Sequence, residues 1–362
     1  MKAGEWFARG ARKIGSMLRL PGLVGFFQAP FHGRLQAGLA AWRSRFRRAP
    51  SDGVIHCFEA RDYPGSRTRQ YLVHLPNGKT SRRARPLLLV LHGCRQDHRD
   101  IQAISGFDRL SDQHRFLVAY PFVTSYRGLR NRNCWGWWFD REIHAGAGEV
   151  EDLWQIVEEI KREYPVDERR IFVTGLSSGA GMAVAMMVAH AGRIAAGAAV
   201  AGVPYAERAS AVRHAFNQHP RSRPVADIVA EMRAELGPDR KPAPLKVVHS
   251  SQDDKVLIES AQTLRDSWGQ CLGVDTARPA QLRQGRDGAT AWEHSCYLDN
   301  GGQATIETLF LEGPGHGWYG GDPGEFSYPD GPDIARRIWR FFKAHPLERR
   351  RVPRQPEIDE AV

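Results

Sequence analysis

The stretch that decides the fold runs Arg170-Ile171-Phe172-Val173-Thr174-Gly175-Leu176-Ser177-Ser178-Gly179-Ala180-Gly181-Met182-Ala183. An apolar, partly β-branched run ends at Gly175, and small residues then lead into a helix-forming run that reaches Ala189. Between them lies Gly-x-Ser-x-Gly, which predicts a sharp strand-to-helix turn with Ser177 at its tip. Such a turn strains the serine backbone, and bulky residues two positions away on either side would clash. The sequence therefore predicts a nucleophile elbow, unless Ser177 simply occupies an ordinary strand-to-helix turn.

Before and after this turn in the sequence, short apolar segments alternate with amphipathic segments. We expect strands at 54–60, 71–75, 87–91, 116–120, 195–201, 245–249, 292–298 and 305–311, and helices at 101–114, 149–164, 225–236, 256–269 and 332–345. This alternation predicts an α/β fold, with a mostly parallel central sheet and helices on both faces. Ligands bind at the carboxyl ends of such strands, so the candidate chemistry should collect there.

An acid and a histidine are expected after the serine, in that order. Asp253 and Asp254 both follow the strand at 245–249, and position alone does not separate them. Either could instead cap the helix that follows. His316 follows the last strand in the glycine-rich loop Gly313-Pro314-Gly315-His316-Gly317-Trp318, which would let its ring enter the site.

An oxyanion hole needs two backbone donors. One is the N–H of Ser178, which opens the helix after the nucleophile, and the other should follow an early strand, where we assign the N–H of Cys94. His92 and His249 are expected to order their loops by hydrogen bonds. These parts predict ester hydrolysis through an acyl-enzyme, with His316 as the base and no metal or cofactor.

Five segments together carry a family resemblance. They are Leu91-His92-Gly93-Cys94-Arg95-Gln96, Asn133-Cys134-Trp135-Gly136-Trp137, Gly148-Glu149, Gly175-Leu176-Ser177-Ser178-Gly179 and Gly315-His316-Gly317-Trp318. In this order they resemble the polyhydroxybutyrate depolymerase esterases, α/β-hydrolases related to feruloyl and acetylxylan esterases, over residues 54–345. The resemblance puts the nucleophile at Ser177, the acid at Asp253, the histidine at His316 and the first oxyanion segment at Cys94. Ser178, Ala180 and Gly136 depart from the residues common in the family.

The resemblance implies a serine esterase acting on poly(3-hydroxybutyrate)-type polyester. The alternatives are a carboxylesterase for plant-wall or small soluble esters, and a non-catalytic granule-coat protein that kept the fold. We expect four tryptophans to line an apolar groove for the polymer, or one or two of them to belong to the core: Trp135, Trp137, Trp138 and Trp318.

Charge is concentrated at one end of the chain. The formal net charge is +10, and residues 1–50 hold ten Lys or Arg against one acid, which is +9 and leaves +1 for the rest. Aromatic residues alternate with these cations. We expect this arm to contact an anionic surface or a granule, or to be a solvated extension docked on the body; nucleic acid is not expected as a partner. The expected domains are the arm 1–50, a catalytic domain 51–346 with a cap or insertion at 204–244, and a polar tail 347–362.

Five cysteines are too few for a disulfide scaffold in 362 residues, and their spacing fits no zinc pattern. Cys94 and Cys134 could pair in an oxidised relative, as could Cys271 and Cys296, but free thiols are expected in a reducing cytoplasm. Neither a signal peptide nor a transmembrane run is predicted. The expectation is a cytoplasmic, granule-associated protein similar to the intracellular depolymerases, with non-standard export as the alternative.

Overall fold

The structure is a computed structural model that describes residues 53–78, 80–123, 133–207 and 223–348. The whole basic arm, nearly all of the polar tail and the segments 124–132 and 208–222 lie outside the described residues. The expectations for the arm and the expected domain boundaries therefore stay predictions. The expected cap or insertion is described only at its two ends.

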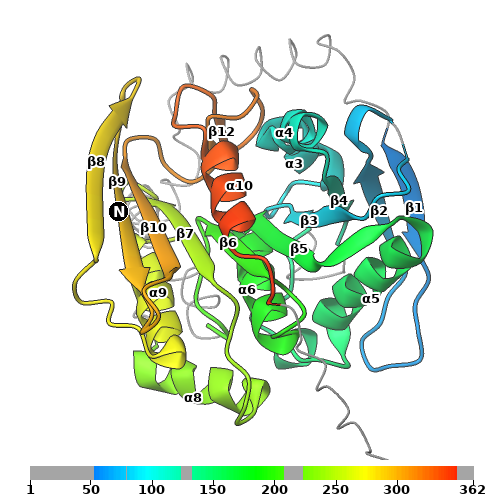
Figure 1. The fold of residues 1–362 in the computed structure, drawn as a ribbon, viewed down its shortest axis with the longest axis horizontal. Coiled ribbons are helices and arrows are strands. Elements are labelled where there is room, and N and C mark those ends of the chain that lie inside the picture. Colours follow the sequence, from blue (N-terminus) through cyan, green and yellow to red (C-terminus); the bar gives the residue numbers. More distant parts are fainter. Residues whose placement is uncertain (1–52, 79, 124–132, 208–222, 349–362) are drawn as a thin grey trace, which may run out of the picture. The chain divides into compact units, whose positions relative to one another are not determined.

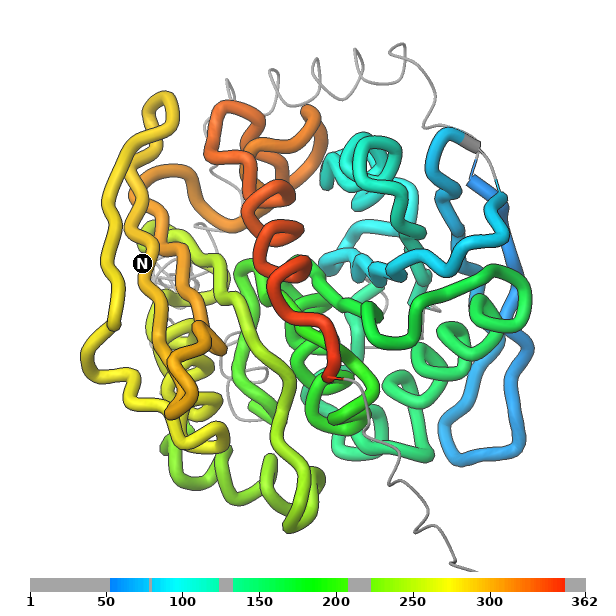
Figure 2. The backbone as a smooth tube through the Cα atoms, viewed as in Figure 1, coloured from blue at the N-terminus to red at the C-terminus, as the bar shows by residue number. Residues whose placement is uncertain are grey.

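Within the described residues, one ten-stranded sheet has the strand order β1-β2-β4-β3-β5-β6-β7-β10-β9-β8. The strands are β1 Val54–Phe58, β2 Arg69–His74, β3 Arg85–Leu91, β4 Leu117–Pro121, β5 Val166–Leu176, β6 Ala196–Val200, β7 Leu245–Ser250, β8 Gln281–Asp287, β9 Thr290–Leu298 and β10 Ala304–Glu312. The central strands from β4 to β10 pair in parallel, whereas β1, β2, β8 and β9 pair antiparallel. Figure 2 lets the chain be followed from the blue strands at one end of the sheet to the yellow and orange strands at the other. A mostly parallel sheet, as predicted, therefore forms the centre.

Helices cover both faces of this sheet. They are α3 His98–Ser105, α4 Phe107–His114, α5 Gly148–Glu163, α6 Ser178–Ala189, α8 Val225–Leu236, α9 Ile258–Leu272 and α10 Ile334–Ala344. One core cluster joins α5, α6, α8 and α9 to the sheet, and a second joins α3, α4 and α10, so each face has its own layer. Figure 1 shows α10 crossing in front of the strands. No described helix combines the length and apolar composition needed to cross a membrane.

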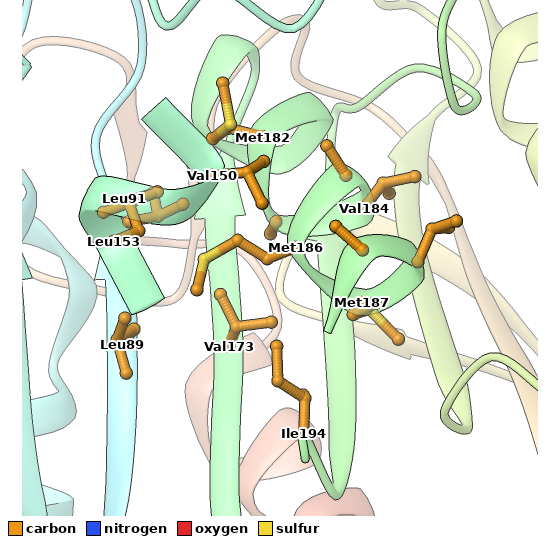
Figure 3. Packing of buried hydrophobic residues seen from close by; sticks show 14 of the residues in the cluster. Leu89, Leu91, Val150, Leu153, Val173, Met182, Val184, Met186, Met187 and Ile194 are labelled. Carbon is orange, nitrogen blue, oxygen red and sulfur yellow. The ribbon is translucent and has the colours of Figure 1, made fainter. Parts of the chain in front are cut away.

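The central strands contribute side chains to both layers because successive residues point to opposite faces. In β3, Leu89 and Leu91 belong to the cluster with α6, whereas Leu88 and Val90 belong to the cluster with α10. Figure 3 shows Leu89, Leu91 and Val173 beside the buried side chains of α5 and α6. Continuous apolar runs such as Leu87–Leu91 are thus explained by burial on both faces.

Three details differ from the sequence-based expectation. The single helix expected at 101–114 is two helices, because Gly106 adopts a left-handed φ of 74° that ends α3 and starts α4 at a new angle. Strand β8 was not expected, since Gln281–Asp287 is mostly exposed and shows no apolar alternation. A short parallel pair, β11 Trp318–Tyr319 and β12 Ser327–Tyr328, lies in the loop after β10 and was also missed.

Candidate active site

The candidate site residues follow the carboxyl ends of neighbouring parallel strands. Cys94 follows β3, Ser177 follows β5, Asp253 follows β7 and His316 follows β10. In the sheet, β3 pairs with β5, and β5, β6, β7 and β10 are consecutive. Because parallel strands all end at the same edge, residues that are far apart in sequence collect there.

Ser177 occupies the strained turn that its sequence context predicts. Its backbone has φ 56° and ψ −116°, a conformation that is rare for a residue with a side chain. The turn is fixed on both sides: the Ser177 N–H donates to the Val200 carbonyl at 2.9 Å, and its carbonyl accepts from the Gly181 N–H at 3.1 Å. A nucleophile-elbow geometry therefore exists at this position.

The two glycines of the motif allow the helix to approach the sheet closely. A Cβ atom at Gly175 would lie 2.4 Å from the carbonyl carbon of Gly179, and one at Gly179 would lie 2.4 Å from the Leu91 carbonyl oxygen. Both contacts are with backbone, which cannot move aside as a flexible side chain can. The start of α6 is thus held against the end of β3, where the loop that carries the candidate oxyanion donor begins.

His316 is hydrogen bonded to Asp253. Its Nδ1 lies 2.7 Å from Oδ2 of the buried carboxylate. The other carboxylate oxygen accepts the N–H groups of Lys255 and Val256, each at 2.9 Å. Asp254 is exposed instead and pairs with the Lys255 ammonium at 3.0 Å. The structure thus distinguishes the two aspartates that position alone did not separate.

The hydrogen bonds at Asp253 also set its charge. Burial alone would raise the pKa of this carboxyl, but the hydrogen bond and charge of His316 outweigh burial and lower it. The carboxylate is therefore ionised at neutral pH and holds the Nδ1 proton of His316, which leaves Nε2 as the basic nitrogen.

The other two histidines near the strand ends order their loops, as expected. His92 Nδ1 donates to the Gly93 carbonyl at 2.8 Å and its Nε2 accepts the Val123 N–H at 3.2 Å, so one neutral tautomer satisfies both. Burial lowers the pKa of His92 to about 4. His249 Nε2 donates to the Val256 carbonyl at 2.7 Å, and burial lowers its pKa as well. Both are neutral and structural.

Within the described residues, the candidate oxyanion loop after β3 has an amide without an acceptor. The Gly93 N–H donates to the side-chain oxygen of Gln96 at 2.9 Å. Among the described residues, no acceptor takes the N–H of Cys94 or that of Ser178, the first residue of α6. The pair of donors assigned from sequence is therefore free to bind a ligand oxygen.

The expectation of free thiols at Cys94 and Cys134 was wrong. The two form a disulfide across 40 residues, with a Cα–Cα distance of 4.3 Å, whereas Cys57, Cys271 and Cys296 are free. The fold places the loop after β3 beside the tryptophan-rich loop, which sequence separation hides. The disulfide thus joins the candidate oxyanion donor to the segment that carries Trp135, Trp137 and Trp138.

The expectation that all four tryptophans line a groove was wrong, and the alternative that one or two of them belong to the core is confirmed for two. Trp135 and Trp318 are completely buried, and their indole N–H groups donate to the carbonyls of His92 at 3.1 Å and Ser105 at 3.2 Å. They belong to the core beneath the site. Trp137 and Trp138 are partly exposed and meet edge to face, with ring centroids 5.2 Å apart.

Trp137 lies next to the elbow helix. A Cβ atom at Gly181, in the first turn of α6, would lie 2.8 Å from Trp137 Cγ. The glycine at this position therefore makes room for the indole four residues from the candidate nucleophile. Of the four tryptophans, this partly exposed pair remains available to contact a substrate.

A buried group of charged side chains, which the sequence did not predict, contacts the loop that carries Trp135, Trp137 and Trp138. Glu149, fully buried at the start of α5, accepts the Gly136 N–H at 2.6 Å, and its carboxylate lies 3.8 Å from the Arg69 guanidinium. Arg69 also donates to buried Asp152 at 2.7 Å. The sequence analysis named Glu149 only within the segment Gly148-Glu149 of the family resemblance. Its contacts could not be predicted because Arg69 and Gly136 come from distant parts of the chain.

A second cluster has the donor types of a metal site but lies elsewhere. His294, Cys296 and Glu307 bring one donor atom each within 4.8 Å of one another. They lie on β9 and β10, and the ammonium of buried Lys246, near the start of β7, bonds Glu307 at 2.5 Å. The cation of this cluster is thus a lysine, and its groups form an ion pair.

Comparison with known proteins places the chain among esterases. A family profile described as "Esterase PHB depolymerase" matches residues 69–285. The chain is 29% identical to poly(3-hydroxyalkanoate) depolymerase C of Paucimonas lemoignei over 257 residues, which cover 68% of this chain and 58% of that protein. It is 27% identical to feruloyl esterase B of Talaromyces funiculosus over 146 residues, or 40% and 39% of the two chains. The chain thus spans less than two thirds of the length of these relatives.

A solved structure has the same fold. Acetyl xylan esterase from Aspergillus awamori superposes with a TM-score of 0.61 at 17% identity, covering 81% of this chain and 100% of the other. At this level of identity the likeness establishes the α/β-hydrolase architecture only.

Proposed function

Because the chain belongs to the esterase PHB depolymerase family of α/β-hydrolases, we propose that it is a serine hydrolase of carboxylic esters that uses Ser177, His316 and Asp253. The observation that carries the proposal is the 2.7 Å hydrogen bond between His316 and Asp253, at the same sheet edge as the strained Ser177. A histidine oriented by a buried carboxylate is the base that activates a serine nucleophile, which supports the proposal.

The proposed reaction proceeds in two halves. His316 accepts the Ser177 proton as the hydroxyl oxygen attacks the ester carbonyl, and the resulting oxyanion is bound by the N–H groups of Cys94 and Ser178. The alcohol then leaves with the proton from His316, and water repeats the sequence to release the acid. Asp253 stabilises the imidazolium in both halves. The helix dipole of α6 favours negative charge at the same place.

The proposed substrate is a poly(3-hydroxybutyrate)-type polyester. The relative named as a depolymerase, which matches over 68% of this chain, supports this class. Trp137, beside the elbow helix, and Trp138, whose ring meets it edge to face, would supply an apolar surface for the polymer chain.

The second candidate is a carboxylesterase for small or plant-wall esters. It is supported by the match to a feruloyl esterase, which covers a shorter part of this chain. The two candidates share the catalytic residues and differ in the pocket, so substrate tests separate them.

The proposal also includes where the protein acts and what residues 1–50 bind. A cytoplasmic granule enzyme would use the basic, aromatic arm of residues 1–50 to bind the granule surface. The Cys94–Cys134 disulfide favours the exported alternative, because cytosolic thiols are kept reduced. Deleting residues 1–50 and measuring co-sedimentation with polyester granules tests the arm; unchanged binding would exclude this role.

Hydrolysis by the wild type and by Ser177→Ala tests the function. The substrates are amorphous polyhydroxybutyrate granules, p-nitrophenyl butyrate and methyl ferulate. Release of hydroxybutyrate acid or oligomers that is lost in Ser177→Ala would support the depolymerase. Ser177-dependent activity on the soluble esters alone would support the second candidate. If Ser177→Ala retained wild-type rates on all three, the proposed nucleophile would be wrong.

A further inference from the structure

Gln96 closes the loop that carries the candidate oxyanion donor. Its side chain is buried, with 1% exposure, and lies just before Asp97, the N-cap of α3. Its side-chain oxygen accepts the Gly93 N–H at 2.9 Å, and its own backbone N–H donates to the Gly93 carbonyl at 3.3 Å. Both backbone polar groups of Gly93 therefore bind Gln96, and the carbonyl also accepts from His92 Nδ1 at 2.8 Å.

The same residue connects this loop to the two other loops of the site. Its amide nitrogen donates to the Glu325 carbonyl at 3.3 Å, and its backbone carbonyl accepts from the Asn133 side chain at 3.3 Å. Glu325 precedes Phe326, whose ring meets that of His316 edge-on with centroids 6.3 Å apart. Asn133 precedes Cys134, the disulfide partner of Cys94. Gln96 thus bonds to the loops of the oxyanion donor, the histidine and the tryptophans.

These contacts distinguish the two successive amides of the loop. Gly93 and Cys94 are successive residues, and the Gly93 N–H is taken by Gln96 while the Cys94 N–H has no acceptor among the described residues. A buried N–H without an acceptor would cost free energy, so loss of the Gln96 oxygen would favour rotation of this loop. Rotation would move the Cys94 N–H away from the oxyanion.

We propose that Gln96 is a positioning residue for the oxyanion hole, which fixes the Gly93–Cys94 segment so that the Cys94 N–H points at the reacting oxygen. The inference rests on the proposed esterase function. It assigns Gln96 no contact with substrate. Its effect should therefore appear in the chemical step, where the oxyanion exists, and not in substrate binding.

The test compares Gln96→Met with Gln96→Glu on p-nitrophenyl butyrate at pH 8. Methionine has a similar length and cannot accept the Gly93 N–H, so we expect kcat to fall about 10- to 100-fold with KM within about 3-fold of wild type. Glutamate keeps an oxygen that can accept this N–H, so it should restore kcat to within about 10-fold of wild type. A trifluoromethyl ketone, which forms an oxyanion on the serine, should bind more weakly to Gln96→Met by a factor similar to the loss in kcat, whereas the matching methyl ketone should not.

A matched control is Gln102→Met. Gln102 is another buried glutamine of the same region, on α3, and its amide donates to Asp108 at 2.8 Å, away from the site loops. It should lower the melting temperature without changing kcat. If Gln96→Met fails to fold, Gln96→Asn replaces it, because its side chain is one methylene too short to reach both Gly93 and Glu325.

The inference is overturned if a folded Gln96→Met, or Gln96→Asn in its place, keeps kcat within about 3-fold of wild type, because displacing an oxyanion donor should lower kcat by more than this. It is also overturned if the variant raises KM and weakens the binding of both ketones by the same factor, which would indicate a role in substrate binding. These outcomes are distinct from a failure of the proposed function, because that failure would appear as Ser177→Ala activity equal to wild type.

Discussion

At the scale of single residues, two adjacent aspartates that their position after the strand does not separate have different environments. Asp253 is buried and holds His316 together with two backbone N–H groups, whereas the Asp254 carboxylate is 71% exposed. Both residues lie in the turn after β7, where the carboxylate of Asp253 folds back onto the Lys255 and Val256 amides and that of Asp254 faces solvent.

Asp253→Asn is expected to lower kcat for p-nitrophenyl butyrate by about 10⁴-fold, because an amide facing Nδ1 favours the wrong tautomer of His316. Asp254→Asn is the matched control and should leave kcat within about 2-fold, since an exposed ion pair contributes little. Equal losses in the two variants would contradict the assignment of the acid.

The lowered pKa of Asp253 fixes the sign of its pH dependence. Its contribution to stability is fully present above the ordinary carboxyl pKa and is lost as the pH falls through the lower folded value. Asp253 therefore stays ionised down to pH values at which other carboxyls have become protonated. Loss of activity on mild acidification should not arise from this residue.

At the scale of elements, strands β7, β10 and β9 are joined by a largely buried group of charged and polar side chains, in which Glu307 bonds both Lys246 and His294. Lys246 of β7 lies opposite Glu307 of β10, which lies opposite Cys296 of β9. Burial alone would raise the pKa of Glu307, but the His294 hydrogen bond and the Lys246 charge lower it to about 2. Lys246 is the second residue of β7 and Glu307 the fourth of β10, so these charges lie away from the strand ends that lead to Asp253 and His316.

Glu307→Gln is expected to lower the free energy of unfolding by about 3–5 kcal/mol at pH 7, because it leaves the Lys246 ammonium buried without its counter-charge. Urea denaturation measures this. The difference from wild type should shrink as the pH falls from 4.5 toward about 2, where Glu307 itself becomes protonated. The double variant Lys246→Met/Glu307→Leu should recover most of the loss, and a Glu307→Gln protein as stable as wild type would refute the explanation.

At the scale of the whole molecule, the site is held together by contacts between loops that are distant in sequence. The Cys94–Cys134 disulfide closes a loop of about 40 residues, and such cross-links stabilise mainly by restricting the unfolded chain. Gln96 and Glu149 provide the noncovalent contacts of the same region.

Reduction of this disulfide by dithiothreitol is expected to lower the free energy of unfolding by about 2–4 kcal/mol, measured by urea denaturation. Thiol titration of the unfolded protein should give three thiols without reductant and five with it. Cys271→Ser is the control and should respond to reductant as the wild type does. An identical unfolding midpoint in both redox states would contradict the assigned cross-link.

The sequence by itself determined the α/β architecture, the strained turn at Ser177 and the order in which the candidate residues occur. These follow from local patterns: apolar runs buried on both faces, small residues where backbones approach, and polar residues just after strand ends. Strand β8 was missed because it lies at the sheet edge, where its backbone pairs but its side chains carry no apolar pattern.

Only the tertiary structure decided which tryptophans are buried and that Cys94 pairs with Cys134. It also shows the contact of His316 with Asp253, the aspartate that the family resemblance indicated and that position alone did not separate from Asp254. Each of these depends on side-chain direction or on contact between segments that sequence separation places far apart. Local patterns carry no information on such distances, because only the packing of the sheet and its helices brings the loops together.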